Sequence, residues 1–385
     1  MPNPIAPLIP ADERFTHQIP ETFAAVASSD PSWTEKVCAM ALARDGSLQI
    51  GFGLGKYPNR NVMDGYAAVS RGKQQLTVRA SRRLAPEALR TAIGPIHYEV
   101  VEPLRQVRFR LERNACQPIA FDWLFEAAVP PFVEERTHLR HAYRLTSELV
   151  RYHQAGVASG WIEIDGLRVE MTPDTWVSTR DHSWGVRYDV GRPPVDVEPR
   201  PEIPPGVGFM MIWCPVLMER RDGSRYALFL HFTWMRGPGF EQKAVTARVE
   251  HPDGRDEAIV EIAPALRFDP RNRRLLGGSL ACRMADGSDR KLEIEVLGDT
   301  GVQLGAGLYF GFDGHHHGEW RGELHVDGER IADCSDPQQA RRLHQIRDTA
   351  VRVRDPAADG VGVGNCQPIA YGPWPELGLG DDPWM

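Results

Sequence analysis

The stretch Trp161–Met171 reads WIEIDGLRVEM, and its pattern indicates the fold class. On either side of Asp165-Gly166 the residues alternate between apolar and polar, as expected for strands with one buried face. An Asp-Gly pair readily adopts the two positive φ angles that a tight hairpin turn needs. The stretch therefore predicts an antiparallel β-hairpin.

The same signature recurs along the chain. Further Asp-Gly pairs with alternating flanks are Asp222-Gly223, Asp253-Gly254 and Asp327-Gly328. Residues 107–112 (VRFRLE) and 291–298 (KLEIEVLG) alternate in the same way, so each predicts a strand. Repeated hairpins of this kind indicate antiparallel meanders.

Helical periodicity is sparse. It is confined to residues 85–93 (APEALRTAI) and 336–348 (DPQQARRLHQIRD), where Asp336 is placed to cap a helix that begins at Pro337. A helical bundle or a doubly wound α/β fold is therefore disfavoured. We expect an all-β protein with few short helices.

A Pro-rich segment at residues 191–208 (GRPPVDVEPRPEIPPGVG) divides the chain near its middle. Proline has no N–H to donate to a sheet, so this segment predicts a linker or a crossover loop. A chain of 385 residues is also longer than most single cores, which split beyond about 250–300 residues. The expected architecture is two β-barrel or sandwich domains, an N-terminal one over residues 1–200 and a C-terminal one over 201–385.

Composition narrows the class of partner. Lys+Arg 45 against Asp+Glu 52 gives a net charge of −7, and the basic residues are dispersed, which argues against nucleic acid or anionic lipid. The N-terminus has no basic segment followed by an apolar run, and no window is apolar enough for a membrane helix. The cysteines are far apart in sequence, which is typical of reduced thiols in a cytoplasmic protein. We expect a small, hydrophobic partner and no stable membrane insertion.

The densest polar block is Thr175–Val190, TWVSTRDHSWGVRYDV. It has the character of a strand, and alternate side chains of a strand point to opposite faces. Asp181 and Ser183 then share one face, whereas His182 and Trp184 share the other. Neighbouring residues placed this way cannot form a Ser-His-Asp relay, so a serine hydrolase is excluded here.

Three segments carry a resemblance to a known family. RDHSWGVR at residues 180–187, HFTWM at 231–235 and GLYFGFDGHHHGEWRGELHVDGE at 307–329 resemble the lipocalin-like hydroxyneurosporene synthase (carotenoid hydratase) superfamily. The resemblance covers the latter half of the chain, and its most specific part is the R-D-H-S-W-G block. It implies two lipocalin-like antiparallel β-barrels and an activity without a cofactor on a hydrophobic, isoprenoid-like or polyketide-derived substrate.

Within this superfamily some members add water across an alkene and others catalyse cyclisations. In the hydratases an aspartate of the D-H block acts as proton donor, and the resemblance assigns that role to Asp181. The hydratases place a tyrosine two residues earlier, where this chain has Thr179.

The chemistry of water addition or removal fits these residues. An aspartate in an apolar cavity keeps its proton to higher pH than usual, so we expect Asp181 to be the general acid and His182 to be its partner or the base that positions water. Aromatic rings could stabilise a cationic intermediate. The expected substrate-binding residues are Trp184, Arg187, Trp213, His231, Trp234, Tyr309 and Trp320.

The run His315–His317 follows Asp313-Gly314. Consecutive residues rarely present three ligands to one metal, so the run predicts a surface turn and no metal site is expected.

Two other functions fit the same sequence. One is a lipocalin-like carrier that binds an apolar ligand unchanged, and the other is a cyclase or isomerase whose cavity orients its substrate. An Asp181 that faces a cavity without a bidentate arginine favours the enzyme. A tight contact with Arg180 or Arg187 would favour the carrier, because it would hold the carboxylate ionised.

Overall fold

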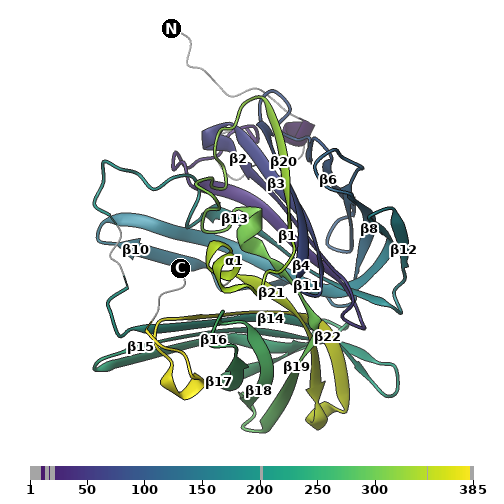
Figure 1. Ribbon diagram of the computed structural model, residues 1–385, viewed down its shortest axis with the longest axis vertical. Coiled ribbons are helices and arrows are strands. Elements are labelled where there is room, and N and C mark those ends of the chain that lie inside the picture. Colours follow the sequence, from purple (N-terminus) through teal and green to yellow (C-terminus); the bar gives the residue numbers. More distant parts are fainter. Residues whose placement is uncertain (1–9, 14–16, 18–21, 200–202, 345, 382–385) are drawn as a thin grey trace.

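The computed structural model describes residues 10–13, 17, 22–199, 203–344 and 346–381. Two antiparallel sheets lie one above the other (Figure 1). The first nine residues, which belong to the N-terminal stretch without a basic segment, lie outside the described residues, as do residues 200–202 of the Pro-rich segment.

The upper sheet is 14-stranded and open, with the order β20-β4-β3-β2-β1-β13-β11-β8-β7-β6-β5 and with β9, β10 and β12 paired to β11. We call it the N-terminal sheet. Its strands are β1 (Trp33–Ala43), β2 (Gln49–Tyr57), β3 (Val62–Arg71), β4 (Gln74–Arg83), β5 (Ala92–Ile93), β6 (Ile96–Glu102), β7 (Gln106–Leu111), β8 (Ile119–Ala127), β9 (Phe132–Val133), β10 (Thr137–His141), β11 (Arg144–Ile164), β12 (Leu167–Met171), β13 (Trp176–Val186) and β20 (Leu324–Ile331). The sheet curls around one apolar core, in which Phe52, Phe109 and Trp123 are fully buried.

The lower sheet is a closed barrel. Its strands are β14 (Gly208–Arg220), β15 (Arg225–Gly237), β16 (Phe240–Glu250), β17 (Asp256–Phe268), β18 (Leu275–Met284), β19 (Asp289–Gln303), β21 (Arg347–Asp355) and β22 (Gly360–Tyr371). A second core fills it, with Phe232, Leu280 and Leu292 fully buried. The expected all-β fold with two barrel-type sheets is confirmed, and only the C-terminal sheet closes completely.

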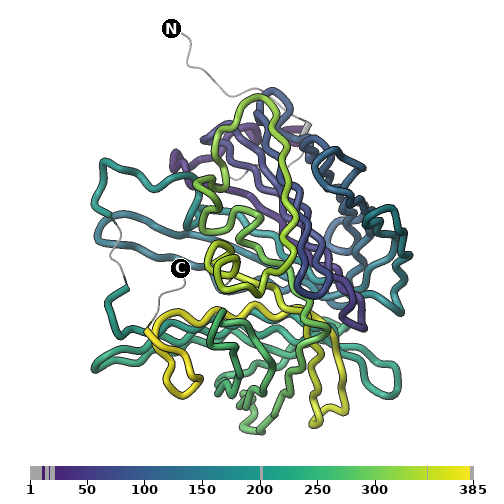
Figure 2. Tube along the Cα trace, in the orientation of Figure 1, coloured from purple at the N-terminus to yellow at the C-terminus, as the bar shows by residue number. Residues whose placement is uncertain are grey.

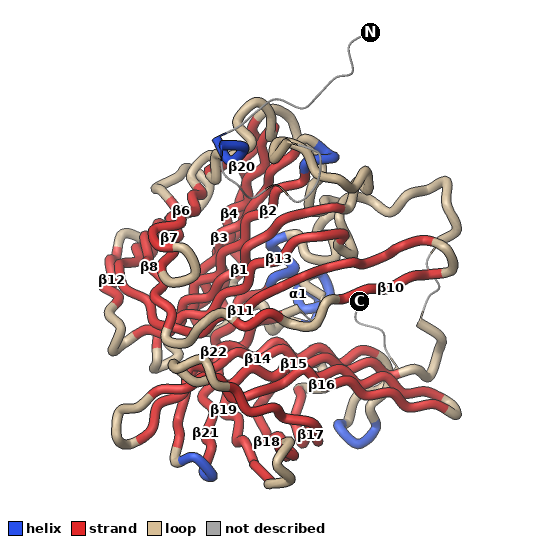
Figure 3. The backbone as a smooth tube through the Cα atoms, turned by 180° about the vertical axis from the view of Figure 1, so that it is seen from behind, coloured by secondary structure: helices blue, strands red, loops and turns tan. Residues whose placement is uncertain are grey.

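Helices are short and few (Figure 3). The described helices are α1 (Pro337–Arg342) and the 3-10 turns η1 (Pro10–Glu13), η2 (Pro58–Arg60), η3 (Leu304–Gly307), η4 (Pro356–Ala358) and η5 (Pro375–Leu377). None of them has the length and apolar character needed to span a membrane.

Most of the local predictions are confirmed. Asp165 and Gly166 both have positive φ angles, 51° and 81°, between β11 and β12, and the pairs at 222–223 and 253–254 also join consecutive strands. Strand β7 turns its apolar side chains inward as its alternation indicates. Asp336 caps α1 by accepting hydrogen bonds from the backbone N–H groups of Gln338 and Gln339.

The fourth Asp-Gly pair was predicted wrongly as a turn. Asp327 and Gly328 lie inside β20, which leaves the C-terminal half and pairs with β4; Figure 2 shows this segment running along the early strands. A Cβ on Gly328 would lie 2.7 Å from the backbone oxygen of Thr77. The glycine therefore permits a close approach between strands.

The helix expected at residues 85–93 is also absent. The guanidinium of Arg82 donates hydrogen bonds to the backbone carbonyls of Arg83, Leu84, Glu87, Arg90 and Ala92. Of these carbonyls, that of Glu87 also accepts a hydrogen bond from the Arg90 N–H across a single turn. The segment therefore wraps around the arginine as a loop that ends in β5.

A buried polar cluster joins the two sheets. His153 on β11 is 1% exposed, and its ring stacks on Phe229 of β15 at 3.5 Å between centroids. Its Nδ1 lies 3.2 Å from Glu134 Oε1 and its Nε2 lies 2.6 Å from Glu250 Oε1 of β16. This cluster fixes the sheets relative to each other beside the candidate site.

Candidate active site

A cavity lies where the two sheets face each other, and we call it the inter-sheet cavity. Strands β1, β11 and β13 form one wall, and β14, β15, β21 and β22 form the other. Its volume is about 360 Å³, within the range of about 300–1,000 Å³ that is usual for small-molecule sites. Its polar lining includes Lys36, Cys38, Arg151, Asp181, His231 and Asp348. The sequence left open whether the site lies inside a barrel or between two, and this cavity lies between them.

Strand β13 divides its side chains as the alternation indicates. Asp181 lines the inter-sheet cavity, whereas His182 lines a separate pocket of the N-terminal sheet. The ring of His182 contacts Glu35 Oε1 at 3.0 Å and the Tyr152 hydroxyl at 3.3 Å. The structure therefore does not bring His182 into the cavity with Asp181.

Within the described residues, no arginine forms an ion pair with Asp181. Arg180 donates to Gln154 Oε1 at 3.0 Å, and Arg187 donates to Ser183 Oγ at 2.5 Å. Among the described residues, none makes a hydrogen bond or an ion pair with the Asp181 carboxylate. Burial raises the pKa of Asp181 and outweighs the opposite effect of the nearby arginines.

Asp348 is a second acidic group of the cavity, and it comes from the barrel. It is 2% exposed and accepts a hydrogen bond of 2.8 Å from Asn365 Nδ2, while Thr179 Oγ1 donates to Asn365 Oδ1 at 2.5 Å. Burial raises the pKa of Asp348 to about 7; the Asn365 hydrogen bond opposes this shift, and the charge of Asp181 adds to it. A carboxyl that titrates near pH 7 is suited to proton transfer at neutral pH.

Lys36 reaches the cavity from β1. Its Nζ lies 2.8 Å from His317 Nε2, and His317 Nδ1 faces Asp64 Oδ1 at 3.5 Å. Asp64 is held in turn by the Tyr57 hydroxyl at 2.9 Å and by the N–H of Gly318 at 2.6 Å. Burial lowers the pKa of Lys36 to about 7 and that of His317 to about 4, so His317 is neutral at pH 7.

The surface turn predicted for His315–His317 is therefore wrong for its last member. His317 is 5% exposed and belongs to the Asp64–His317–Lys36 chain, whereas His315 pairs with Glu319 at 3.0 Å. No group of three or more His, Cys, Asp or Glu side chains in the described part of the chain is arranged to hold a metal ion.

Arg151 and His231 complete the polar lining beside Asp181. Arg151 forms a two-pronged ion pair with Glu134, with a distance of 2.8 Å from Nε to Oε1. Burial lowers the pKa of His231 to about 4, and the charge of Arg151 contributes to the shift. His231 is therefore neutral near pH 7 and can accept a hydrogen bond from water.

The remaining expected residues divide between the cavity and other places. Arg187, Trp213, His231 and Tyr309 line the inter-sheet cavity. Trp184 and Trp320 are 38% and 50% exposed elsewhere. Trp234 packs against Trp374 at the barrel core, with 4.8 Å between ring centroids.

Lys36 and Asp348 are not among the site residues expected from the sequence. A lysine inside the largely apolar strand 33–43 (WTEKVCAMALA) was an available signal for Lys36, because a buried ammonium needs a partner. Asp348 carried no such signal. An acid next to an arginine at the beginning of a strand is ordinary in sequence, and only the stacking of two sheets buries it.

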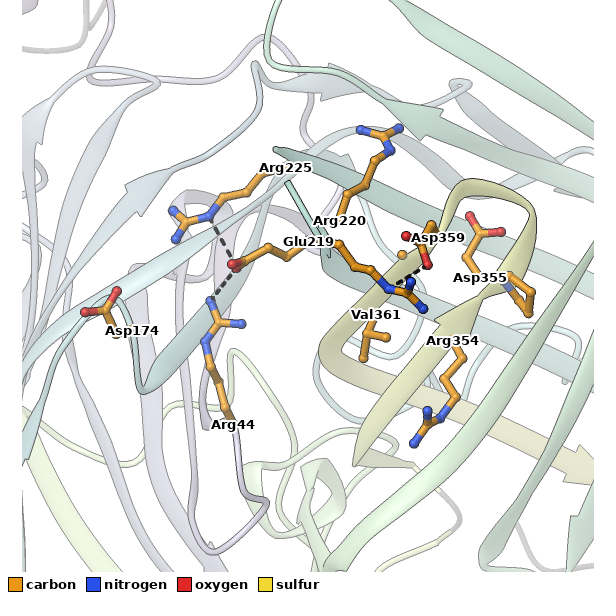
Figure 4. A pocket seen from close by; sticks show the side chains of 12 residues that line it. Arg44, Asp174, Glu219, Arg220, Arg225, Arg354, Asp355, Asp359 and Val361 are labelled. Carbon is orange, nitrogen blue, oxygen red and sulfur yellow. Dashed lines mark ion pairs between the residues drawn. The ribbon is translucent and has the colours of Figure 1, made fainter. Parts of the chain in front are cut away.

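A larger pocket lies elsewhere, with a volume of about 620 Å³, between the β14–β15 and β21–β22 hairpins. Figure 4 shows Glu219 between two arginines, at 3.8 Å from Arg44 and 3.7 Å from Arg225. Arg221 and Asp359 form a further ion pair of 3.2 Å. Such mutually paired, exposed charges are ordinary surface electrostatics, so this pocket is the weaker candidate for chemistry.

Comparisons with known proteins give a family and distant structural neighbours. A family model for a family of unknown function (DUF8625) matches residues 8–379, and comparison with curated protein sequences gives no match. A protein assigned as AttH from Nitrosomonas europaea is 14% identical, with a TM-score of 0.48 over 94% of this chain and 99% of that one. Kievitone hydratase from Nectria haematococca is 9% identical, with a TM-score of 0.41 over 92% and 94%. CghA with Sch210972 is 10% identical, with a TM-score of 0.44 over 88% of each chain. Similarity this remote does not extend any activity to this chain.

Proposed function

The chain belongs to the DUF8625 family, whose function is unknown, and from its inter-sheet cavity we propose a hydratase or dehydratase that acts on a hydrophobic small molecule. Water is added to a carbon–carbon double bond, or removed from the corresponding alcohol, by proton transfer within the cavity. The sequence resemblance to the hydroxyneurosporene synthase superfamily points to the same class of reaction.

The main support for the proposal is that Asp181 and Asp348 line the same cavity. The two carboxyl groups come from different sheets, and burial raises the pKa of each. Paired carboxyls whose environments separate their titrations are a common source of an acid and a base in one site.

The surroundings divide the roles between the two groups. Positive charges of Arg151, Arg187 and Lys36 favour the ionised form of Asp181. Among the residues that the structure describes, no cation lowers the pKa of Asp348. Asp348 therefore keeps its proton to higher pH and is the proton donor in this proposal, with Asp181 as the acceptor. This reverses the role expected for Asp181 from the sequence, and it keeps Asp181 in the reaction.

The lining suits a partly apolar ligand and a water molecule. Leu149, Met211, Trp213 and Leu304 contribute apolar surface, which favours binding of a hydrophobic molecule. The neutral imidazole of His231 supplies an acceptor for water. These groups support hydration or dehydration with the protein's own side chains.

The test is incubation of the purified protein with a panel of apolar alkenes, enones and their alcohols, followed by mass spectrometry. We expect wild type to convert at least one compound with gain or loss of one water, and Asp222→Asn to behave like wild type. Asp222 is a suitable control because it lies in a hairpin turn and its Oδ1 accepts from Ser224 N, as an asparagine oxygen can. Retention of every bound compound unchanged would support the carrier, and an isomer of equal mass would support the cyclase or isomerase.

A further inference from the structure

The ammonium of Lys36 is fixed at the wall of the inter-sheet cavity. It is 3% exposed, contacts His317 Nε2 at 2.8 Å and lies 3.9 Å from the centroid of the Tyr309 ring. An ammonium has three N–H donors, and within the described residues no carboxylate lies within ion-pair distance of Nζ. At least one N–H of Lys36 is therefore available to donate a hydrogen bond to a group of a ligand inside the cavity.

Arg187 adds a second positive charge beside Asp181. Its Nη2 donates to Ser183 Oγ at 2.5 Å, and its buried Nε has no hydrogen-bond partner. In the part of the chain that the structure describes, Arg187 forms no ion pair with a carboxylate. This differs from Arg151, which Glu134 neutralises.

These charges decide which kind of intermediate the cavity can stabilise. The ring of Tyr309 already faces the Lys36 ammonium, and the ring of Trp213 faces the Arg151 guanidinium at 5.7 Å. The ring of Tyr309 is thus next to the Lys36 ammonium, and a carbocation placed against it would be repelled, whereas Glu134 neutralises the guanidinium beside Trp213. An intermediate that carries negative charge on oxygen would be stabilised.

On the basis of the proposed function, we infer that the substrate is a carbonyl compound, a β-hydroxy ketone or the corresponding enone, and that Lys36 donates a hydrogen bond to its carbonyl oxygen. His317 and Asp64 are positioning residues, because they hold the Lys36 ammonium and do not themselves reach the substrate. Arg187 adds positive charge on the same side of the cavity.

The dehydration step balances with these groups alone. The Asp181 carboxylate takes the proton from the carbon next to the carbonyl, and the electron pair moves to the carbonyl oxygen, which Lys36 stabilises as an enolate. The enolate then re-forms the carbonyl and the new carbon–carbon double bond. The β-hydroxyl leaves with the proton of Asp348 as water, and transfer of a proton from Asp181 to Asp348 restores the starting state. Hydration is the reverse sequence.

The test uses benzylideneacetone, an aromatic enone, and phenylbutene, which lacks the carbonyl oxygen. We expect benzylideneacetone to bind wild type with a red-shifted absorption, because a hydrogen bond to a cation polarises the enone. Phenylbutene should bind at least about tenfold more weakly, since a hydrogen bond to a charged group is worth about that factor or more. Burial raises the pKa of Cys38 to about 12, so this neutral thiol is not expected to add to the probe.

Lys36→Met should remove the red shift and weaken benzylideneacetone binding by about tenfold or more, with phenylbutene binding unchanged. Lys56→Met is the matched control. Lys56 lies on the neighbouring strand β2 and lines the pocket that contains His182, but it does not line the inter-sheet cavity. A red shift retained in Lys36→Met, absence of the shift in wild type, or equal binding of the two probes to wild type would overturn the inference. Comparison of benzylideneacetone with phenylbutene on wild type tests the inference even if Lys36→Met does not fold. A Lys36-dependent shift without any conversion would instead count against the hydratase proposal alone.

Discussion

Asp181→Asn is expected to lower kcat/KM for water addition or removal by about 10²–10⁴-fold, the usual contribution of a positioned acid or base. Asparagine has nearly the same volume as aspartate, but it cannot take up the proton. Because burial makes the ionised carboxylate costly, the folded protein should be at least as stable as wild type. Steady-state kinetics and thermal unfolding of the variant, compared with Asp222→Asn, measure both effects.

The same variant also tests the coupling between the two carboxyls. In wild type the activity should fall as pH rises through about 7, where Asp348 loses its proton and Lys36 loses its positive charge. The charge of Asp181 contributes to that raised pKa, so in Asp181→Asn the fall should occur at lower pH. An unchanged pH profile together with unchanged kcat/KM would remove Asp181 from the reaction.

His153→Ala is expected to destabilise the folded protein by about 3–5 kcal/mol, the usual cost of leaving a buried charge without its partner. Glu250 is 5% exposed, and His153 is its hydrogen-bond partner at 2.6 Å. Urea unfolding measures the change in free energy. His251→Ala is the control, because its partner Glu257 is half exposed and the loss should stay below about 1 kcal/mol.

The stabilisation by His153 should depend on pH. Burial alone would lower the pKa of His153, but hydrogen bonds and charges of Glu134 and Glu250 raise it above its ordinary value. A raised pKa means that the proton is held more tightly in the folded state. The difference in stability between wild type and His153→Ala should be largest below pH about 6.5 and shrink as pH rises through the folded-state pKa. An equal loss at all pH values would mean that His153 acts only by packing on Phe229.

The strands could be predicted because alternation is a local property of the sequence. Residues 107–112 alternate and form β7, and Asp165-Gly166 makes a turn because both flanking runs can pair with each other. Asp327-Gly328 has the same local signature but pairs with β4, about 250 residues earlier. No local pattern distinguishes the two cases, since the outcome depends on which strand offers a free edge.

In the candidate site, too, local features could be predicted from the sequence and long-range contacts could not. Alternation along β13 correctly separated Asp181 from His182, because side-chain direction follows from strand geometry. The contacts that make the cavity are long-range: Lys36 and His317 are 281 residues apart, and Asp348 reaches Asp181 only because the barrel packs under the N-terminal sheet. Residue type alone does not place an aromatic side chain, and Trp184, Trp234 and Trp320 lie outside the cavity.

NMR titration of carboxyl-labelled aspartate measures whether burial in the inter-sheet cavity raises the pKa values of Asp348 and Asp181 above the ordinary aspartate value. Asp181→Asn and Asp348→Asn assign the two resonances. We expect the Asp348 carboxyl to titrate near pH 7 and the Asp181 carboxyl to titrate above the ordinary aspartate value of about 4. Titration of Asp348 at about 4 would exclude it as the proton donor, because its carboxyl would then hold no proton at neutral pH.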